Sequence, residues 1–157
     1  MLATTITSPT KTLMPTLISF DPGGTTGVSI ISFDESYYSL VETMQIAGGL
    51  SGFIRWAGPH DFRQYDVIVC EDFTLRPGVH GADITPAYVI GALEAIVDGV
   101  MPVVYQQPSQ KKLCGDERLE RLEVRKPGVP HANDATRHGI IYLRNKMHLP
   151  VLEKGWK

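Results

Sequence analysis

The sequence predicts an α/β fold built on a mixed five-stranded sheet, in which an antiparallel meander precedes parallel strands and helices cover both faces. Two observations support this prediction. Three strand-like segments follow one another through short connections, and the later strand-like segments alternate with helix-like segments. Short connections favour antiparallel neighbours, whereas strands separated by a helix usually pair in parallel.

The first two strands flank a glycine-rich turn. Residues 16–20 and 28–33 are apolar and β-branched, and between them the chain reads Asp-Pro-Gly-Gly-Thr-Thr-Gly at 21–27. Such a pair forms a hairpin, and its glycines allow a ligand to approach the backbone closely. Asp21 ends the first strand, where a carboxylate is costly to bury without a positive partner. A turn aspartate that binds its own backbone is an equally good explanation at this point.

Periodicity and breaker residues predict the remaining elements. The clearest strand covers residues 66–73, and its nearly continuous apolar character indicates that both faces are covered. The last helix covers residues 131–148, with Pro130 at its start. The other expected elements are a third strand at 38–46, helices at 50–57 and 84–97, a short strand at 102–105, and a polar, basic, partly helical segment at 106–126.

Length and composition favour a single domain over residues 16–157, preceded by a loose tail at 1–15. The chain has 157 residues, of which 43% are hydrophobic, enough for one core. No apolar run is long enough to span a membrane, and the tail lacks the pattern of a secretion signal. Cys70 and Cys114 form no CxxC pair and fit a reducing compartment, so we expect a cytoplasmic protein.

The net charge of −2 hides an asymmetry between the two parts of the chain. Residues 1–100 carry four Lys or Arg against eleven Asp or Glu, whereas residues 101–157 carry eleven against six. An acidic part that can hold cations, joined to a basic part that can hold phosphates, suits a nucleic-acid enzyme. A helical surface that is simply exposed to solvent would give the same counts of charged residues, so it is an alternative explanation of the asymmetry.

Three carboxylates and one imidazole come from distant parts of the chain. Asp21 and Glu71 end strands, and His131 and Asp134 lie three residues apart on one face of the last helix. A strand-end salt bridge, a helix-terminus charge and a surface cap are ordinary explanations for single members. Together they form a mostly oxygen site for Mg²⁺ or Mn²⁺, and two such ions clamp the attacking water and the leaving oxygen in phosphodiester cleavage.

Three segments that contain these residues resemble the motifs of a nuclease family. They read Phe-Asp-Pro-Gly at 20–23 followed by Thr-Gly at 26–27, Val-Ile-Val-Cys-Glu at 67–71, and His-Ala-Asn-Asp-Ala at 131–135. In this order they resemble the RNase H-like nucleases, most of all their RuvC branch, the Holliday junction resolvases. The resemblance covers residues 17–145, and the compact chain looks like a phage-encoded member. It implies a homodimer whose two active sites cut opposite strands of a four-way DNA junction by paired nicks.

The resemblance also implies roles for individual residues. Asp21, Glu71, His131 and Asp134 match the family's catalytic residues, which would hold two Mg²⁺ or Mn²⁺ ions. The family has a strand ending in Tyr-x-Pro with a lysine four residues beyond the proline. Residues 105–108 (Tyr-Gln-Gln-Pro) and Lys112 fit this pattern, so Lys112 is expected to touch the scissile phosphate.

Four residues are expected to contact DNA. Lys111 competes with Lys112 for the active-site role, and Phe73 lies one residue before the family's base-stacking aromatic. Arg118 belongs to a basic stretch that acidic residues interrupt here, unlike in the family. The helix from Ile84, with Tyr88, Leu93 and Ile96, could supply the dimer face or pack in the core.

Three other functions stay open. The turn at 21–27 also resembles the phosphate-binding turn of the actin-like and sugar-kinase ATPases, but that family needs two lobes and a second Asp-Gly turn. A non-catalytic binding module predicts a broken acidic set, whereas here each expected position is filled. A nuclease of the same fold that acts on RNA is harder to separate from a DNA enzyme. His138 could also face the site, although an exposed helical histidine is more common.

Overall fold

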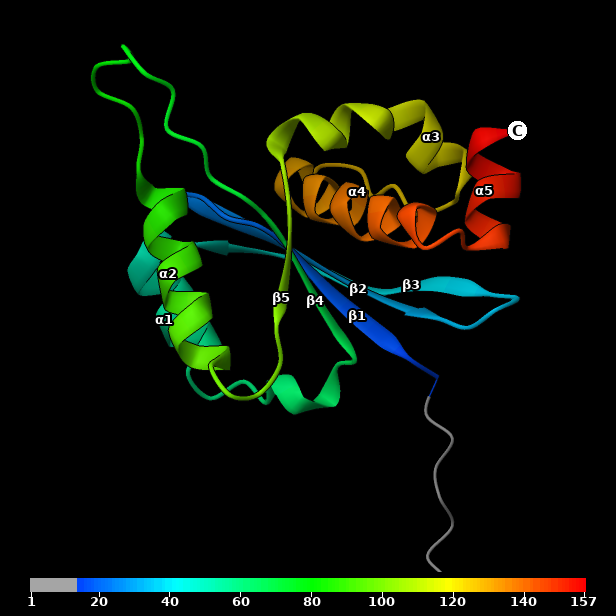
Figure 1. The fold of residues 1–157 in the computed structure, drawn as a ribbon, viewed down its shortest axis with the longest axis horizontal. Helices are drawn as coiled ribbons and strands as arrows, with labels where there is room; N and C mark the ends of the chain where they lie inside the picture. Colours follow the sequence, from blue (N-terminus) through cyan, green and yellow to red (C-terminus); the bar gives the residue numbers. More distant parts are fainter. Residues whose placement is uncertain (1–13) are drawn as a thin grey trace, which may run out of the picture.

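The structure, a computed structural model, describes residues 14–157 and contains one mixed five-stranded sheet (Figure 1). Strands β1, β2 and β3 form an antiparallel meander, and β4 and β5 add in parallel beside β1, in the order β3-β2-β1-β4-β5. This confirms the predicted fold class. Of the predicted tail, residues 1–13 lie outside the described residues. The strands are β1 (Thr16–Asp21), β2 (Thr25–Phe33), β3 (Tyr38–Ala47), β4 (Val67–Glu71) and β5 (Val103–Gln106).

Helices cover both faces of the sheet. As Figure 1 shows, α1 and α2 lie on one face, and α3, α4 and α5 lie on the other. None of the helices in the described part of the chain is long and apolar enough to cross a membrane. The helices are α1 (Gly49–Ala57), α2 (Thr85–Val97), α3 (Asp116–Arg121), α4 (Pro130–Asn145) and α5 (Leu149–Trp156), with short 3₁₀ segments η1 (Phe62–Gln64) and η2 (Pro108–Leu113).

The predicted last helix, over 131–148, runs past the end of α4, and a further helix, α5, follows it. Helix α4 ends at Asn145, and Met147 has a φ of 59°, a left-handed conformation that breaks the helical path. His148 then caps α5, since its side chain accepts a hydrogen bond from the Val151 backbone N–H, and Pro150 occupies the first turn. The single helix predicted over 131–148 is therefore wrong at its C-terminal end.

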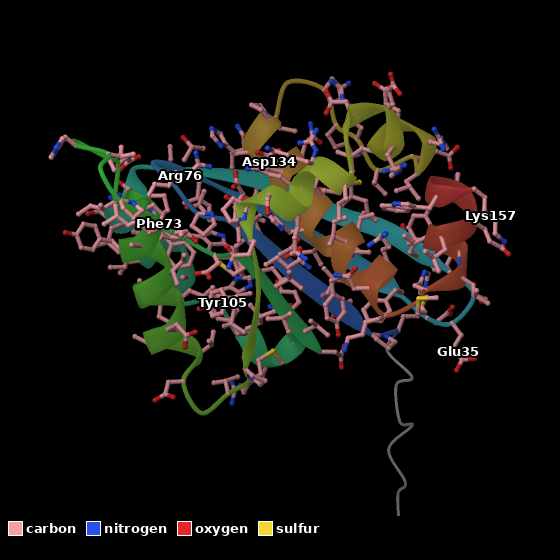
Figure 2. The ribbon with its side chains drawn as sticks, turned by 45° about the horizontal axis from the view of Figure 1, so that its top comes forward. Glu35, Phe73, Arg76, Tyr105, Asp134 and Lys157 are labelled. Atoms are coloured by element: carbon pink, nitrogen blue, oxygen red, sulfur yellow. The ribbon has the colours of Figure 1, made fainter. Side chains whose placement is uncertain are left out.

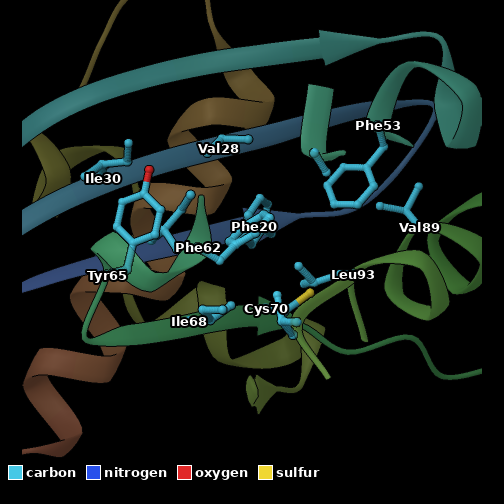
Figure 3. Close-up of a cluster of buried hydrophobic side chains, with 13 residues drawn as sticks. Phe20, Val28, Ile30, Phe53, Phe62, Tyr65, Ile68, Cys70, Val89 and Leu93 are labelled. Atoms are coloured by element: carbon cyan, nitrogen blue, oxygen red, sulfur yellow. The ribbon is translucent and has the colours of Figure 1, made fainter. Parts of the chain in front are cut away.

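Alternation along β1 gives the molecule two cores. Ile18 and Phe20 face α1 and α2, and Figure 3 shows Phe20 beside Phe53, Phe62 and Leu93 in this cluster. Leu17 faces the other way, into the cluster beneath α4 and α5. Because Leu93 is 1% exposed, it belongs to the core of the α2 face and is no part of a free surface for a dimer.

Helix α4 lies unusually close to the sheet. A Cβ added at Gly27 in β2 would fall 1.8 Å from the backbone oxygen of His131, and one at Gly139 would fall 2.9 Å from Cδ1 of Ile31. The Ser19 hydroxyl in β1 donates to the Ala135 carbonyl across 2.7 Å. Small residues on both elements thus bring the start of α4 against the end of β1 and the beginning of β2.

Candidate active site

Asp21 and Glu71 meet at one edge of the sheet because their strands are parallel neighbours. Phe20 of β1 pairs with Cys70 of β4. The residues that follow them, Asp21 and Glu71, therefore lie side by side at the ends of the two strands. The first turns of α4 bring Asp134 to this edge, and Figure 2 marks Asp134 on α4. The structure therefore gathers three carboxylates that are distant in the sequence, and their catalytic role stays a prediction.

The ammonium group of Lys111 lies among the three carboxylates. Its Nζ is 3.0 Å from Oε2 of Glu71, 3.0 Å from Oδ2 of Asp134 and 3.8 Å from Oδ1 of Asp21. Burial alone would lower the pKa of Lys111, but the charge of Asp21 and the hydrogen bonds to Glu71 and Asp134 outweigh it and raise that pKa.

The expectation that Lys112 is the lysine of the site needs correction. Lys112 is exposed, whereas its neighbour Lys111 reaches the carboxylates. Both lie in η2, a 3₁₀ segment with about three residues per turn, so adjacent side chains point about 120° apart. Only one of the two lysines can face α4, and the structure assigns that position to Lys111.

Asp21 is the most deeply buried of the three carboxylates, at 7% exposure. Burial raises the pKa of Asp21 to about 6, although the nearby Lys111 charge acts in the opposite direction. The carboxylates of Glu71 and Asp134 raise it further. A buried acid among like charges is poised to gain from a bound cation.

Glu71 has a buried partner, His138, which the sequence analysis named only as a possible residue of the site. His138 is fully buried, with its Nε2 2.6 Å from Oε2 of Glu71 and its Nδ1 2.8 Å from Oε1 of Gln106. Burial alone would raise the pKa of Glu71, but the hydrogen bonds from His138 and Lys111 prevail and lower it. The four-residue spacing between Asp134 and His138 was the available signal, and the expected exposure of His138 is wrong.

Arg137 holds Asp134 from the other side, and the sequence analysis missed it. Its guanidinium donates to Asp134, to Asp116 at the start of α3, and across 2.9 Å to the Cys114 carbonyl. The Arg137 side chain is only 14% exposed. The i,i+3 spacing from Asp134 on α4 is the signal that could have identified it.

His131 lies at the open side of the site. Its Nδ1 is 3.4 Å from Oδ2 of Asp21, and its side chain is 48% exposed. The His131 backbone N–H donates to the Gln45 side chain of β3, which fixes the start of α4. His131 can therefore move toward a ligand at Asp21 without disturbing the fold.

The expected DNA-contacting residues divide into two groups. Phe73, on the segment that leaves β4, lines a groove of about 360 Å³ with Glu71 and with Arg76, a residue that was not predicted (Figure 2). Arg118 lies elsewhere, since its Nε donates to the Gly155 carbonyl across 2.7 Å and its guanidinium stacks 4.4 Å from the Trp156 ring centroid. Arg118 thus joins α3 to α5 and does not reach the carboxylates.

The donor set fits a hard divalent cation. Carboxylate oxygens from three elements converge on the Lys111 ammonium group. Carboxylate oxygens are the ligands that Mg²⁺ and Mn²⁺ prefer. Within residues 14–157, no three His, Cys, Asp or Glu side chains are drawn close enough to coordinate one ion directly. The oxygens are arranged around Lys111 instead.

Comparisons with known proteins identify the fold. No protein-family model matches the sequence, and neither does any curated protein. Among solved structures, RuvC of Thermus thermophilus matches with a TM-score of 0.63 at 15% identity, over 85% of this chain and 97% of that chain. The chain has the RuvC fold. The fowlpox virus Holliday junction resolvase matches with a TM-score of 0.56 at 13% identity, over 83% of this chain and 99% of that one.

One of the matching RuvC structures is a complex with a Holliday junction substrate, with a TM-score of 0.62 at 14% identity over 83% of this chain and 96% of that chain. At these identities the similarity concerns the RuvC fold, that is, the mixed sheet and the helix packed across it.

Proposed function

We propose that this protein is a metal-dependent endonuclease that cuts branched DNA and resolves four-way junctions by paired nicks. The observation that carries the proposal is the convergence of Asp21, Glu71 and Asp134 from β1, β4 and α4 on one cationic point at the edge of a RuvC fold. Matching solved structures include Holliday junction resolvases in complex with junction DNA.

Asp21, Glu71, Asp134 and His131 are the residues that would hold the metal, which we propose to be two Mg²⁺ or Mn²⁺ ions. When bound, such ions make a water nucleophilic near neutral pH and stabilise the departing 3′ oxygen. The chain's contribution is to fix the oxygens in advance. His138 orients Glu71, and Arg137 orients Asp134, as outer partners of metal ligands commonly do.

Lys111 supplies the positive charge for the reacting phosphate. Its ammonium group already lies at the centre of the site, 3.0 Å from two carboxylates, so a small side-chain rotation carries it to a phosphate bound there. A fixed cation beside the phosphoryl oxygens stabilises the charge that develops on them. Phe73, on the rim of the groove beside Glu71, is placed to stack on a base.

Two further features belong to the proposal. Paired nicks in opposite strands need two active sites, so we propose a homodimer in which exposed side chains of α2, such as Tyr88 at 56% exposure, contribute to the interface. The second feature is a cytoplasmic location, which stays a prediction. The phosphotransferase alternative needs two lobes, whereas residues 14–157 form a single sheet.

The test compares substrates of matched sequence. Purified protein is incubated with a labelled four-way junction, a linear duplex and an RNA–DNA hybrid, with Mg²⁺, with Mn²⁺ or with chelator. We expect paired nicks near the crossover of the junction, little cutting of the duplex, and no cutting with chelator. Asp21→Asn should abolish cutting, whereas Asp98→Asn, a matched change at the end of α2, should retain it.

The remaining outcomes contradict the proposal in separate ways. Preferred cutting of the hybrid would assign the same site to an RNA-directed nuclease. Absence of cutting with either metal, together with nucleotide binding or ATP turnover, would favour the phosphotransferase.

A further inference from the structure

Several of the oxygens needed for a metal ion already contact cationic or hydrogen-bonding side chains of the protein. Oδ2 of Asp134 and Oε2 of Glu71 each lie 3.0 Å from Nζ of Lys111. The second oxygen of Asp134 takes the guanidinium of Arg137, and Oε2 of Glu71 also takes His138. Both oxygens of Asp134 therefore already contact a protein cation while Lys111 stays in place.

A divalent cation and the Lys111 ammonium group cannot share this space. Like charges a few ångströms apart in a partly buried site repel strongly, and here Asp21 is largely shielded from water and Lys111 is partly shielded. Lys111 also holds the three carboxylates in an arrangement centred on itself, in which the described residues present no direct three-ligand metal cluster. When a divalent cation binds, one of the two cations must therefore move away from the carboxylates.

We propose that Lys111 is a built-in counter-cation, which stabilises the carboxylates of the metal-free protein and leaves them when divalent metal binds. This deepens the proposed function, on whose metal site it rests. The lysine that leaves then becomes the residue available to a phosphate, so metal loading and preparation of the phosphate contact are one event.

The local structure permits this exchange at little cost. The Lys111 side chain is 29% exposed, so it has an open path to solvent, and its four methylenes can rotate without moving η2. Arg137, in contrast, is held by Asp116 and by the Cys114 carbonyl as well as by Asp134. Among the cations near Asp134, Lys111 is thus the one that can leave.

The direct test measures access to the Lys111 amine. Full-length protein is treated briefly with an amine-reactive reagent at fixed pH, with chelator or with saturating Ca²⁺, Mg²⁺ or Mn²⁺, and each lysine is quantified by tandem mass spectrometry. We expect labelling of Lys111 to rise several-fold with metal. Lys112, its exposed neighbour, should label equally in both conditions and serves as the internal reference. Unchanged or reduced labelling of Lys111 on metal binding would overturn the proposal.

A second measurement uses affinity for the metal alone. Removing the competing ammonium group with Lys111→Met should tighten Mn²⁺ binding, measured by titration calorimetry, by about tenfold or more. The matched Lys112→Met should bind as the wild type does. Equal affinities of the two variants would contradict the exchange, as would a wild type that binds no divalent ion.

Failure of this inference and failure of the proposed function give different results. Junction cutting with no metal-dependent exposure of Lys111 would reject the exchange and keep the nuclease. Exposure of Lys111 by metal without cutting of any nucleic acid would keep the exchange and reject the nuclease.

Discussion

The burial of a charged group, the Asp21 carboxylate, determines the properties of the candidate site. Asp21 is 7% exposed and lies with Glu71 and Asp134 around a single ammonium group, so the metal-free site gathers more negative charge than Lys111 compensates. Burial, together with the like charges of Glu71 and Asp134, raises the pKa of Asp21 to about 6. Buried like charges of this kind destabilise the folded protein without metal and increase its affinity for cations.

The stability of the metal-free protein should therefore depend on Asp21. Because the folded-state pKa of about 6 lies above the ordinary value of 3.8, the folded protein binds the proton more tightly and loses stability as the pH rises through this window. The loss from this one group is on the order of 2–3 kcal/mol by pH 7.5. In urea unfolding with chelator, Asp21→Asn should exceed the wild type in stability at pH 7.5, and the gap should narrow at pH 5. An equal gap at both pH values would contradict this assignment.

Arg137 should act through Asp134. Arg137→Gln removes the guanidinium that fixes one Asp134 oxygen, so we expect junction cutting to fall about 10- to 100-fold, the range for residues that orient metal ligands. Junction binding, measured in Ca²⁺, should change little, which separates positioning from loss of the DNA surface. Wild-type cutting in Arg137→Gln would show that Asp134 needs no such support.

The sequence alone could assign residues to strands and helices, but it could not predict which side chains surround the candidate site. Asp21, Glu71 and Asp134 could be proposed because strand ends and a helix start mark them. Lys111 could not be told from Lys112, since one residue in a 3₁₀ turn changes the direction of the side chain by about 120°. The partners His138 and Arg137 depend on how α4 rotates against the sheet, which local periodicity does not fix.

At the scale of elements, the packing of α4 on the sheet assembles the site. Gly27 lets β2 touch the first turn of α4, and the Ser19 hydroxyl joins β1 to Ala135. The strands and α4 could be predicted from apolar periodicity and from Pro130. The separation of α5 could not, because it depends on the left-handed backbone at Met147, a residue type that rarely adopts it.

Gly27→Ala tests this packing. The added Cβ would fall 1.8 Å from the His131 carbonyl oxygen, so α4 must shift. We expect a loss of stability of about 1–3 kcal/mol in urea unfolding, together with reduced junction cutting. Gly24→Ala, in the same turn but with open space around the added Cβ, is the matched control and should behave as the wild type. Similar behaviour of the two variants would show that the close approach is unimportant.

At the scale of the whole molecule, charge separates along the chain. Residues 101–157 carry eleven Lys or Arg against six Asp or Glu and include η2, α3 and α4, whereas residues 1–100 are acidic. The proposed binding of junction DNA would therefore rely on the basic part and its contacts to phosphates. Such contacts release counterions, so affinity falls steeply with salt.

Salt dependence is the corresponding prediction. Raising KCl from about 50 to 200 mM at constant Ca²⁺ should weaken junction binding by at least about tenfold, the loss expected when several phosphates are contacted. The measurement is fluorescence anisotropy with a labelled junction across a salt series. Affinity that is insensitive to salt would contradict a phosphate-contacting surface.

In the proposed nuclease, Asp21 and Asp134, 113 positions apart in the sequence, act as one catalytic centre. The most direct measurement is the single-turnover rate of junction cutting by Asp21→Asn, by Asp134→Asn and by the double variant. Each single change should reduce the rate at least about 100-fold, and the double variant should lose little more, because residues that act as a unit are not additive. Losses that multiply in the double variant, or a single variant that cuts like the wild type, would contradict the claim.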